Sequence, residues 1–486
     1  MARNTRWARR PLAVVSVVAL VVGLGGAAGA EVDPSSPLDT EDRAEVAAAY
    51  RDEVFLPDQA VPALGWTGNV GGCVVGTIST AARQSALDRI NWYRRMAGLE
   101  PVVFDADYNH QSQAAALNML ANPPPLTHNP SPSSACYSAD AATGAGKGNL
   151  AEGSATSRAP AHVIDLWVDD GSNISPGVGH RSGLLDPRIL RTGYGQVQNG
   201  SGWAAGQRWL PSSAADLGPR TVTGSGSVAA VPATGQRAVV WPPAGFVPYA
   251  HTYRLWSLQY VGACFDDVSI TVTGPFGTVH PDPVDLGPHA PDGDPDCLGP
   301  GYLPESTVSW DMGPTLGLGA FGGPTVHPRP DGDIDYDVTV TGVDLDGAAT
   351  SFTYTVTVFD PQDFADVGLA HPFFTEIGWM YSDGVSTGSA NPDGPGLVDW
   401  PRAAVKRRAM AAFLYRLAGE PPVASPTPHF ADVGTGHPFF EEIQWMFEAG
   451  VSTGGPNPSG PGVVFQPREV VKRQAMAAFL FRIQDE

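Results

Sequence analysis

The side chains best suited to chemistry in the first half of the chain are imidazoles and carboxylates that lie far apart in the sequence. They are His128, Glu152, Asp169, Asp170 and His180. Groups of these types can hold a divalent metal or transfer protons. No HExxH sequence places two histidines and a base on one helix face. Spacing alone therefore does not define a catalytic site.

Two further segments match a known nucleophile pattern. Gly384–Gly388 and Gly450–Gly454 both read GVSTG and fit G-x-S-x-G. A nucleophile elbow requires a turn from a strand into a helix, whereas both copies follow a predicted helix and lead into a Pro/Gly-rich loop. The chain also lacks a phosphate-binding loop, a dinucleotide fingerprint and a CxxC pair. No common hydrolase, nucleotide or thiol-redox signature is present.

Composition limits the partners of the chain. It has 486 residues, which suggests about three domains. Acidic residues outnumber basic ones by 50 to 29, for a net charge of −21. Such a surface repels phosphate backbones, so we expect no nucleic-acid partner.

The first thirty residues have the pattern of a secretory signal peptide. Four arginines precede an apolar run, Pro11 to Leu24, and Ala28-Gly29-Ala30 ends the segment. The run is too short to span a bilayer. No later stretch is long and apolar enough to do so. We therefore predict cleavage after Ala30 and a secreted mature chain without a transmembrane segment.

Export permits disulfide bonds. Cys73 and Cys136 fall in one predicted domain, and Cys264 and Cys297 in the next. Pairing within each domain is the simplest of the three connectivities that four cysteines allow. We expect these bonds to be structural.

Hydrophobic periodicity divides the mature chain. Residues 31–72 form an acidic leader with a helix around Ala44–Tyr50. Residues 73–235 show helical patterns, which predict helices that end at Gly98, cover Tyr108–Ala121 and cover Pro160–Val168. In residues 236–360 apolar residues alternate with polar ones, which predicts an antiparallel β-sandwich. We interpret this sandwich as a spacer.

The last part of the chain is a duplication. Residues 361–420 and 421–486 repeat with a constant offset of 66 residues. Each copy predicts a helix, a Gly/Pro-rich loop and a second helix, at Phe373–Asp383 and Val405–Leu417 in the first copy. Matching segments include Phe364-Ala-Asp-Val367 with Phe430-Ala-Asp-Val433, His371-Pro-Phe-Phe374 with His437-Pro-Phe-Phe440, and Val405-Lys-Arg407 with Val471-Lys-Arg473.

These repeats resemble S-layer homology (SLH) domains of bacterial cell surfaces, which open with F-x-D-V and start a second helix with a Thr-Arg signature. The resemblance implies binding of anionic cell-wall polysaccharide through the signature region. By position it assigns that contact to Lys406, Arg407, Lys472 and Arg473. Cations at a helix N-terminus suit an anionic ligand. The family usually combines three units, and here there are two.

The segment from residue 80 to 197 resembles the CAP superfamily of cysteine-rich secretory, antigen 5 and pathogenesis-related 1 proteins. The resemblance rests on Ile90-Asn91 with Arg94, His128, Gly148-Asn-Leu-Ala151 and Gly179-His-Arg181. It implies an α-β-α sandwich with a cleft in which two histidines and two acids hold zinc or another divalent ion. His128 and His180 match the histidines and Asp170 the second acid, whereas Gly148 stands where the first acid belongs.

Taken together, the sequence predicts a multi-domain protein with an α-β-α CAP-like domain, an all-β, immunoglobulin-like sandwich and helical SLH-like repeats. We expect a secreted bacterial protein at the cell envelope, held through wall polysaccharide, whose CAP-like cleft takes an unidentified ligand. This interpretation favours a protein that is not an enzyme and has no assured cofactor. One alternative is a metal-dependent hydrolase of wall peptide or glycan, with zinc on His128, Asp170 and His180. Another is a structural surface array.

Overall fold

The computed structural model describes residues 36–471 except for 124–125, 155–156, 172–176, 214–216, 234, 287–304, 319–324, 346, 383 and 395. The predicted signal peptide and the residues Cys297, Lys472 and Arg473 lie outside the described residues. Within them, no helix is both long enough and apolar enough to cross a membrane.

Capping residues and buried faces account for the main helices of the N-terminal α/β region. Helix α4 (Thr80–Met96) starts where the Ser79 side chain accepts a hydrogen bond from the Ala82 amide. Its predicted inner face, Ala86, Ile90 and Tyr93, is buried. Asp105 caps α5 (Ala106–Ala121) in the same way. Pro160 opens α7 (Pro160–Asp169), as Pro favours the first helical position. These three helices lie where the periodicity predicts them.

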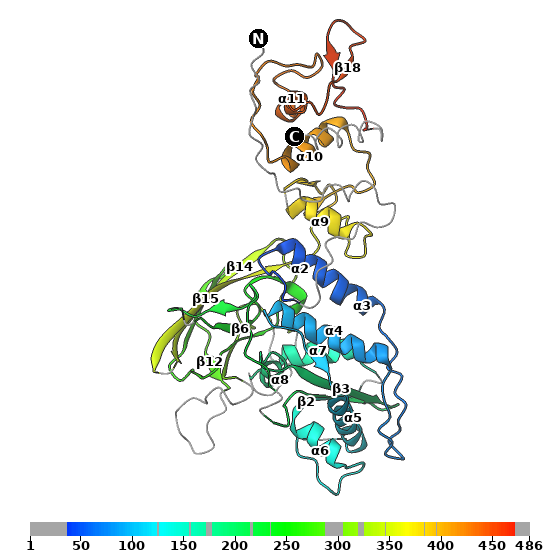
Figure 1. The fold of residues 1–486 in the computed structure, drawn as a ribbon, viewed down its shortest axis with the longest axis vertical. Helices are drawn as coiled ribbons and strands as arrows, with labels where there is room; N and C mark the ends of the chain where they lie inside the picture. Colours follow the sequence, from blue (N-terminus) through cyan, green and yellow to red (C-terminus); the bar gives the residue numbers. More distant parts are fainter. Residues whose placement is uncertain are drawn as a thin grey trace, which may run out of the picture. The chain divides into compact units, whose positions relative to one another are not determined.

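A four-stranded sheet separates these helices into layers. Its order is β1-β3-β4-β2, formed by β1 (Val103–Phe104), β3 (Arg191–Gln198), β4 (Trp203–Arg208) and β2 (Gly148–Gly153). Helix α5 and the short α6 (Ala139–Gly146) cover one face, where alanines and leucines form a core with Val197. Helices α4 and α7 lie over the other face (Figure 1). A last short helix, α8 (Gly179–Leu184), follows α7 in the sequence.

Two packed sheets form the middle of the chain. One has the order β12-β13-β8-β6-β5 and the other β11-β10-β14-β15-β7, with β9 paired to β14. Their bounds are β5 Val228–Ala229, β6 Arg237–Trp241, β7 Gly245–Pro248, β8 Leu255–Gln259, β9 Ala263–Cys264, β10 Ser269–Gly274, β11 Gly277–Val279, β12 Pro283–Asp285, β13 Thr307–Asp311, β14 Ile334–Leu345 and β15 Ala348–Phe359.

Alternation explains how these sheets pack. In β14, Tyr336, Val338 and Val340 are buried, as the period of two predicts. The Tyr336 ring meets Trp256 of the opposite sheet edge-on, with centroids 5.6 Å apart. Strand β5 belongs to the sandwich although it lies upstream of the predicted boundary at residue 236. The immunoglobulin-like topology stays a prediction.

The disulfides follow the predicted pairing as far as the described residues reach. Cys73 and Cys136 form a disulfide across a sequence separation of 63. Cys264 is also disulfide-bonded. Its predicted partner, Cys297, lies outside the described residues.

The leader is helical and has buried contacts with the α/β region. It contains α2 (Arg43–Ala49), the π-helix η1 (Tyr50–Phe55) and α3 (Leu56–Gln59). Glu53 pairs with the buried Arg95 of α4 at 2.5 Å, and Asp58 pairs with Arg89 at 2.7 Å. The predicted helix near Ala44–Tyr50 is therefore confirmed, in a segment that is part of the folded protein.

The two repeats share one core. Repeat 1 contains α9 (Phe374–Ser382) and α10 (Arg407–Leu417), and repeat 2 contains α11 (Phe440–Glu448). The shared core is formed by α10 with repeat 2, whereas α9 contacts α2 of the leader. Each also holds a short strand pair that the sequence does not predict, β16 (Ser389–Ala390) with β17 (Leu397–Val398) and β18 (Gly455–Pro456) with β19 (Val463–Val464). Helix α10 packs through Met410, Ala411 and Leu414 into the core of repeat 2. The repeats are therefore not independent helix pairs.

Candidate functional site

Asp170 and His180 form the one contact among the predicted metal ligands that the structure shows. Asp170 ends α7 in the left-handed conformation, with φ 54° and its carboxylate fully buried. One carboxylate oxygen lies 2.6 Å from His180 Nδ1, and the other accepts the Arg181 amide at 3.0 Å. A carboxylate on Nδ1 fixes the tautomer and the orientation of an imidazole. Asp170 thus orients His180, whose side chain is 22% exposed.

His128 has a different environment. Its side chain is exposed, and Nδ1 lies 2.7 Å from the carbonyl oxygen of Ala145 at the end of α6. No three His, Cys, Asp or Glu side chains among the described residues are grouped so that they could hold a metal ion. The predicted set of His128, Asp170 and His180 is therefore not assembled. The zinc hypothesis has no support in the described part of the chain.

Gly148, which stands at the place of the missing acid, is fixed by strand pairing. It begins β2 opposite Arg208 of β4. A Cβ atom at this position would lie 1.9 Å from the Gln207 carbonyl oxygen and 2.7 Å from the Arg208 Cα. Those atoms belong to the backbone and cannot move aside locally. No acidic side chain fits here without displacement of the sheet.

The neighbouring Asn149 is buried and structural. Its amide donates to the His180 carbonyl oxygen at 3.1 Å and to Gln207 Oε1 at 3.0 Å, and its Oδ1 accepts from Trp209 Nε1 at 3.0 Å. These bonds attach α8 to the sheet. The described residues around His180 therefore hold the histidine in place.

The arginine predicted to meet wall polysaccharide makes contacts inside the protein. Arg407 Nε donates to the Phe465 carbonyl oxygen at 2.6 Å, and its guanidinium lies 4.7 Å from the Phe465 ring centroid. Burial lowers the pKa of Arg407. Because Phe465 belongs to repeat 2, Arg407 connects the two repeats. Lys406 is exposed. Lys472 and Arg473 lie outside the described residues.

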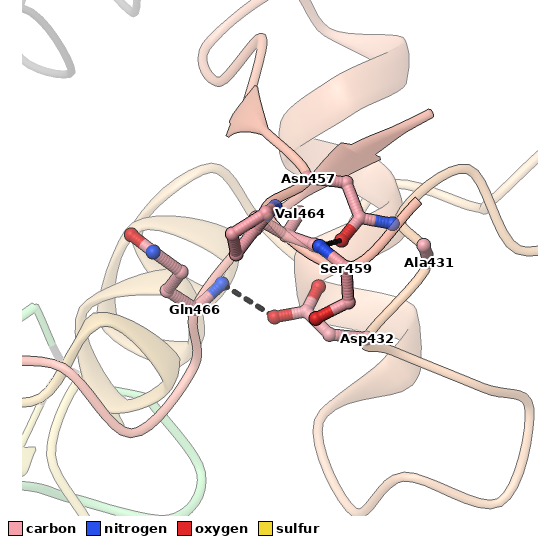
Figure 2. Close-up of a pocket in the computed structure, with 7 residues that line it drawn as sticks. Ala431, Asp432, Asn457, Ser459, Val464 and Gln466 are labelled. Carbon is pink, nitrogen blue, oxygen red and sulfur yellow. Dashed lines mark hydrogen bonds between the residues drawn. The ribbon is translucent and has the colours of Figure 1, made fainter. Parts of the chain in front are cut away.

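An open pocket lies beside this contact in repeat 2 (Figure 2). Its volume is about 350 Å³. Asp432 of the F-x-D-V motif accepts hydrogen bonds from the Phe465 and Gln466 amides, both at 2.8 Å. This carboxylate holds Gln466 in the left-handed conformation, at φ 60°. The lining residues are Ala431, Asp432, Asn457, Pro458, Ser459, Val464 and Gln466.

Comparison with known proteins agrees with these features. Residues 87–210 match the family model of CAP, the cysteine-rich secretory protein family, and residues 429–477 match that of the S-layer homology domain. The chain contains a CAP domain and an SLH domain. No curated protein matches the chain. The combination is that of a cell-surface protein held at the envelope by its SLH part.

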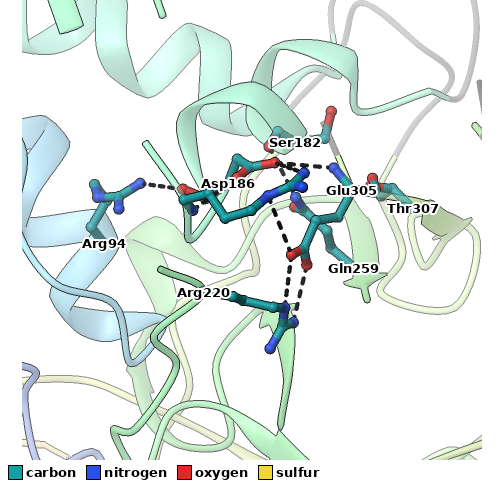
Figure 3. A network of polar contacts seen from close by, with 8 residues as sticks. Arg94, Ser182, Asp186, Arg220, Gln259, Glu305 and Thr307 are labelled. Atoms are coloured by element: carbon teal, nitrogen blue, oxygen red, sulfur yellow. Dashed lines mark hydrogen bonds and ion pairs between the residues drawn. The ribbon is translucent and has the colours of Figure 1, made fainter. Parts of the chain in front are cut away.

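The CAP domain and the β-sandwich share a buried polar network, which the sequence analysis missed (Figure 3). Glu305, just before β13, accepts two hydrogen bonds from Arg220, at 2.7 and 3.0 Å. Asp186, just after α8, accepts the Arg188 amide at 2.9 Å and the Glu305 amide at 3.1 Å. Burial raises the pKa of both carboxyl groups. Both carboxylates are fully buried, so the network joins two parts of the protein and does not face a substrate.

A second buried cation joins the CAP domain to the sandwich. Arg181 of α8 donates to the carbonyl oxygens of Val168 and Asp169 and, across the boundary, to the Leu255 carbonyl oxygen at 2.8 Å. Burial lowers its pKa to about 10. The resemblance includes Arg181 in its Gly-His-Arg motif, and the structure gives it a positioning role next to His180.

Proposed function

We propose that this is a secreted bacterial cell-surface protein whose SLH repeats attach it to wall polysaccharide and whose CAP domain takes a further ligand. The observation that carries the proposal is the presence of a CAP domain and an SLH domain in one chain. The signal-peptide pattern of residues 1–30 and the Cys73–Cys136 disulfide support an extracellular location.

The shared core of the repeats supports attachment by two units. Helix α10 of repeat 1 completes the core around Trp445 and Phe465 in repeat 2. Backbone hydrogen bonds join the same segments, from the Arg407 amide to the Glu469 carbonyl oxygen and from the Val471 amide to the Val405 carbonyl oxygen. Two repeats interlocked in this way can act as one binding head.

A sedimentation assay with purified walls tests the proposal. The mature chain should sediment with intact walls and stay in the supernatant with walls from which the polysaccharide has been extracted. Equal amounts of chain in both pellets would contradict attachment through polysaccharide. Analytical ultracentrifugation of the chain alone tests the structural-array alternative. That alternative requires large assemblies, whereas we expect a single chain at the same concentrations.

The hydrolase alternative is not favoured by any contact in the described residues. Among the described residues, His180 has a carboxylate partner, Asp170, but no assembled metal set. The ligand of the CAP domain is therefore proposed to be bound and not cleaved.

A further inference from the structure

Trp400 in repeat 1 has an unusual position for a large aromatic residue. It is 49% exposed, and its backbone has φ 57°, in the left-handed region that favours glycine. Asp366 of the F-x-D-V motif holds it there by accepting the Asp399 and Trp400 amides, both at 2.9 Å. Exposed apolar area and a strained backbone both reduce stability, and strained residues cluster at functional sites.

In repeat 2, the equivalent loop borders an open pocket. Gln466 takes the position of Trp400 there, with φ 60° and the same two-amide clamp from Asp432. It lines the open pocket of about 350 Å³ (Figure 2). Among the seven lining positions, repeat 1 differs at two, with Asp393 in place of Ser459 and Trp400 in place of Gln466. Repeat 1 therefore places an indole ring and a carboxylate where repeat 2 has two neutral polar groups.

The charged residues around Trp400 indicate which ligand charge the loop can accept. The nearby carboxylates are Asp366, Asp393 and Asp399, and none forms an ion pair with another described residue. Burial raises the pKa of Asp399, and the charge of Asp366 raises it further, whereas His371 lowers it. Arg402 is exposed two residues further on. An acidic loop of this kind disfavours a ligand that carries carboxylate or phosphate.

We propose that the loop from Leu397 to Arg402 is a saccharide subsite for an uncharged or amino sugar, with Trp400 as its stacking platform. The apolar face of a pyranose ring packs on the indole, as flat apolar groups pack on aromatic rings. Hydroxyl or ammonium groups of the sugar donate hydrogen bonds to Asp393, and an ammonium group also gains from the face of the indole. The proposal rests on wall attachment as the proposed function and deepens it. It assigns recognition in repeat 1 to this loop and not to Arg407.

Calorimetric titration of the full chain tests the proposal with three tetrasaccharides of matched length. They are N-acetylglucosamine tetramer, which is neutral, glucosamine tetramer, which is cationic, and galacturonic acid tetramer, which is anionic. We expect one of the first two to bind and the anionic tetramer not to bind. Failure of both the neutral and the cationic tetramer to bind would overturn the proposal, as would preferential binding of the anionic one at this loop.

Variants then locate the site. Trp400→Gln copies the residue of the sister repeat, so it keeps the loop geometry while it removes the platform. We expect the affinity to fall about three- to tenfold, which corresponds to a lost stacking contact of about 0.7–1.4 kcal/mol. The control is Phe373→Ala, which removes a ring of the same repeat that is 59% exposed and should leave the affinity unchanged. Equal affinity of Trp400→Gln and the unaltered chain would refute the assignment.

The wall assay separates this proposal from the proposed function. If the unaltered chain fails to sediment with intact walls, wall attachment itself is wrong. If the chain sediments, but Trp400→Gln binds walls and tetrasaccharides as well as the unaltered chain does, only the Trp400 subsite is wrong.

Discussion

The contact between Arg407 and Phe465 gives the sharpest prediction, because two roles for one arginine lead to opposite results. The hydrogen bond from Arg407 Nε to the Phe465 carbonyl oxygen involves a charged donor, which contributes about 1.5–3 kcal/mol. The guanidinium over the ring adds about 0.5–1 kcal/mol. Arg407 is only half-buried, so we take the lower part of the sum. Arg407→Ala should therefore destabilise the shared core of the repeats by about 2 kcal/mol.

Hydrogen exchange followed by mass spectrometry measures this loss in the intact chain. Where amides exchange through opening of the shared core, 2 kcal/mol corresponds to roughly thirtyfold faster exchange. The effect should appear in peptides that cover α10 and residues 463–471 and be absent from the CAP domain. Lys406→Ala is the matched control, because it removes a neighbouring cation whose side chain is exposed. Unchanged exchange in Arg407→Ala, together with weaker wall binding, would refute a structural role and restore the arginine as a direct ligand contact.

Three other predictions concern the CAP domain and its neighbours. Gly148→Ala should severely destabilise the CAP domain, because its Cβ would lie 1.9 Å from the Gln207 carbonyl oxygen. Thermal unfolding measures this loss. Gly179→Ala is the control, because a Cβ atom at that position has no other atom within 4 Å. Replacement of Cys73 and Cys136 by serine should cost about 4 kcal/mol in denaturant unfolding, from the sequence separation of 63; no change would show that the loop is already ordered in the unfolded chain. Burial lowers the pKa of His251 below its ordinary value of about 6.5, so the unfolded chain takes up the proton first, and stability should fall as pH drops below about 6.5. His251→Phe should flatten the pH dependence of the free energy of unfolding between pH 7 and 5, and an unaltered slope would contradict this.

Local patterns in the sequence predict the helices and strands well. Helices α5 and α7 begin and end, and α4 ends, within about two residues of the predicted positions, because their caps and apolar faces are encoded in consecutive residues. The alternation in β14 and β15 likewise predicts which side chains are buried. Both kinds of signal depend on neighbours a few positions away.

The candidate site was harder to predict, since its contacts join distant residues. The partner of Arg407 is 58 residues away in the sequence, and Asp186 meets the Glu305 amide across 119 residues. No periodicity reports such pairs. The position of Asp170 in the motif predicts a metal ligand, whereas its left-handed backbone at the end of α7 turns the carboxylate toward His180 and Arg181.

The buried arginines also change the role expected for the β-sandwich. A spacer needs only to separate the parts that it joins. Arg181 instead donates hydrogen bonds to both the CAP domain and β8. Glu305 of the sandwich forms an ion pair with Arg220, and its amide donates to Asp186 of the CAP domain. Separation of the two would break these hydrogen bonds, and hydrogen bonds to charged groups contribute about 1.5–3 kcal/mol each. The CAP domain and the sandwich therefore hold each other in a fixed orientation.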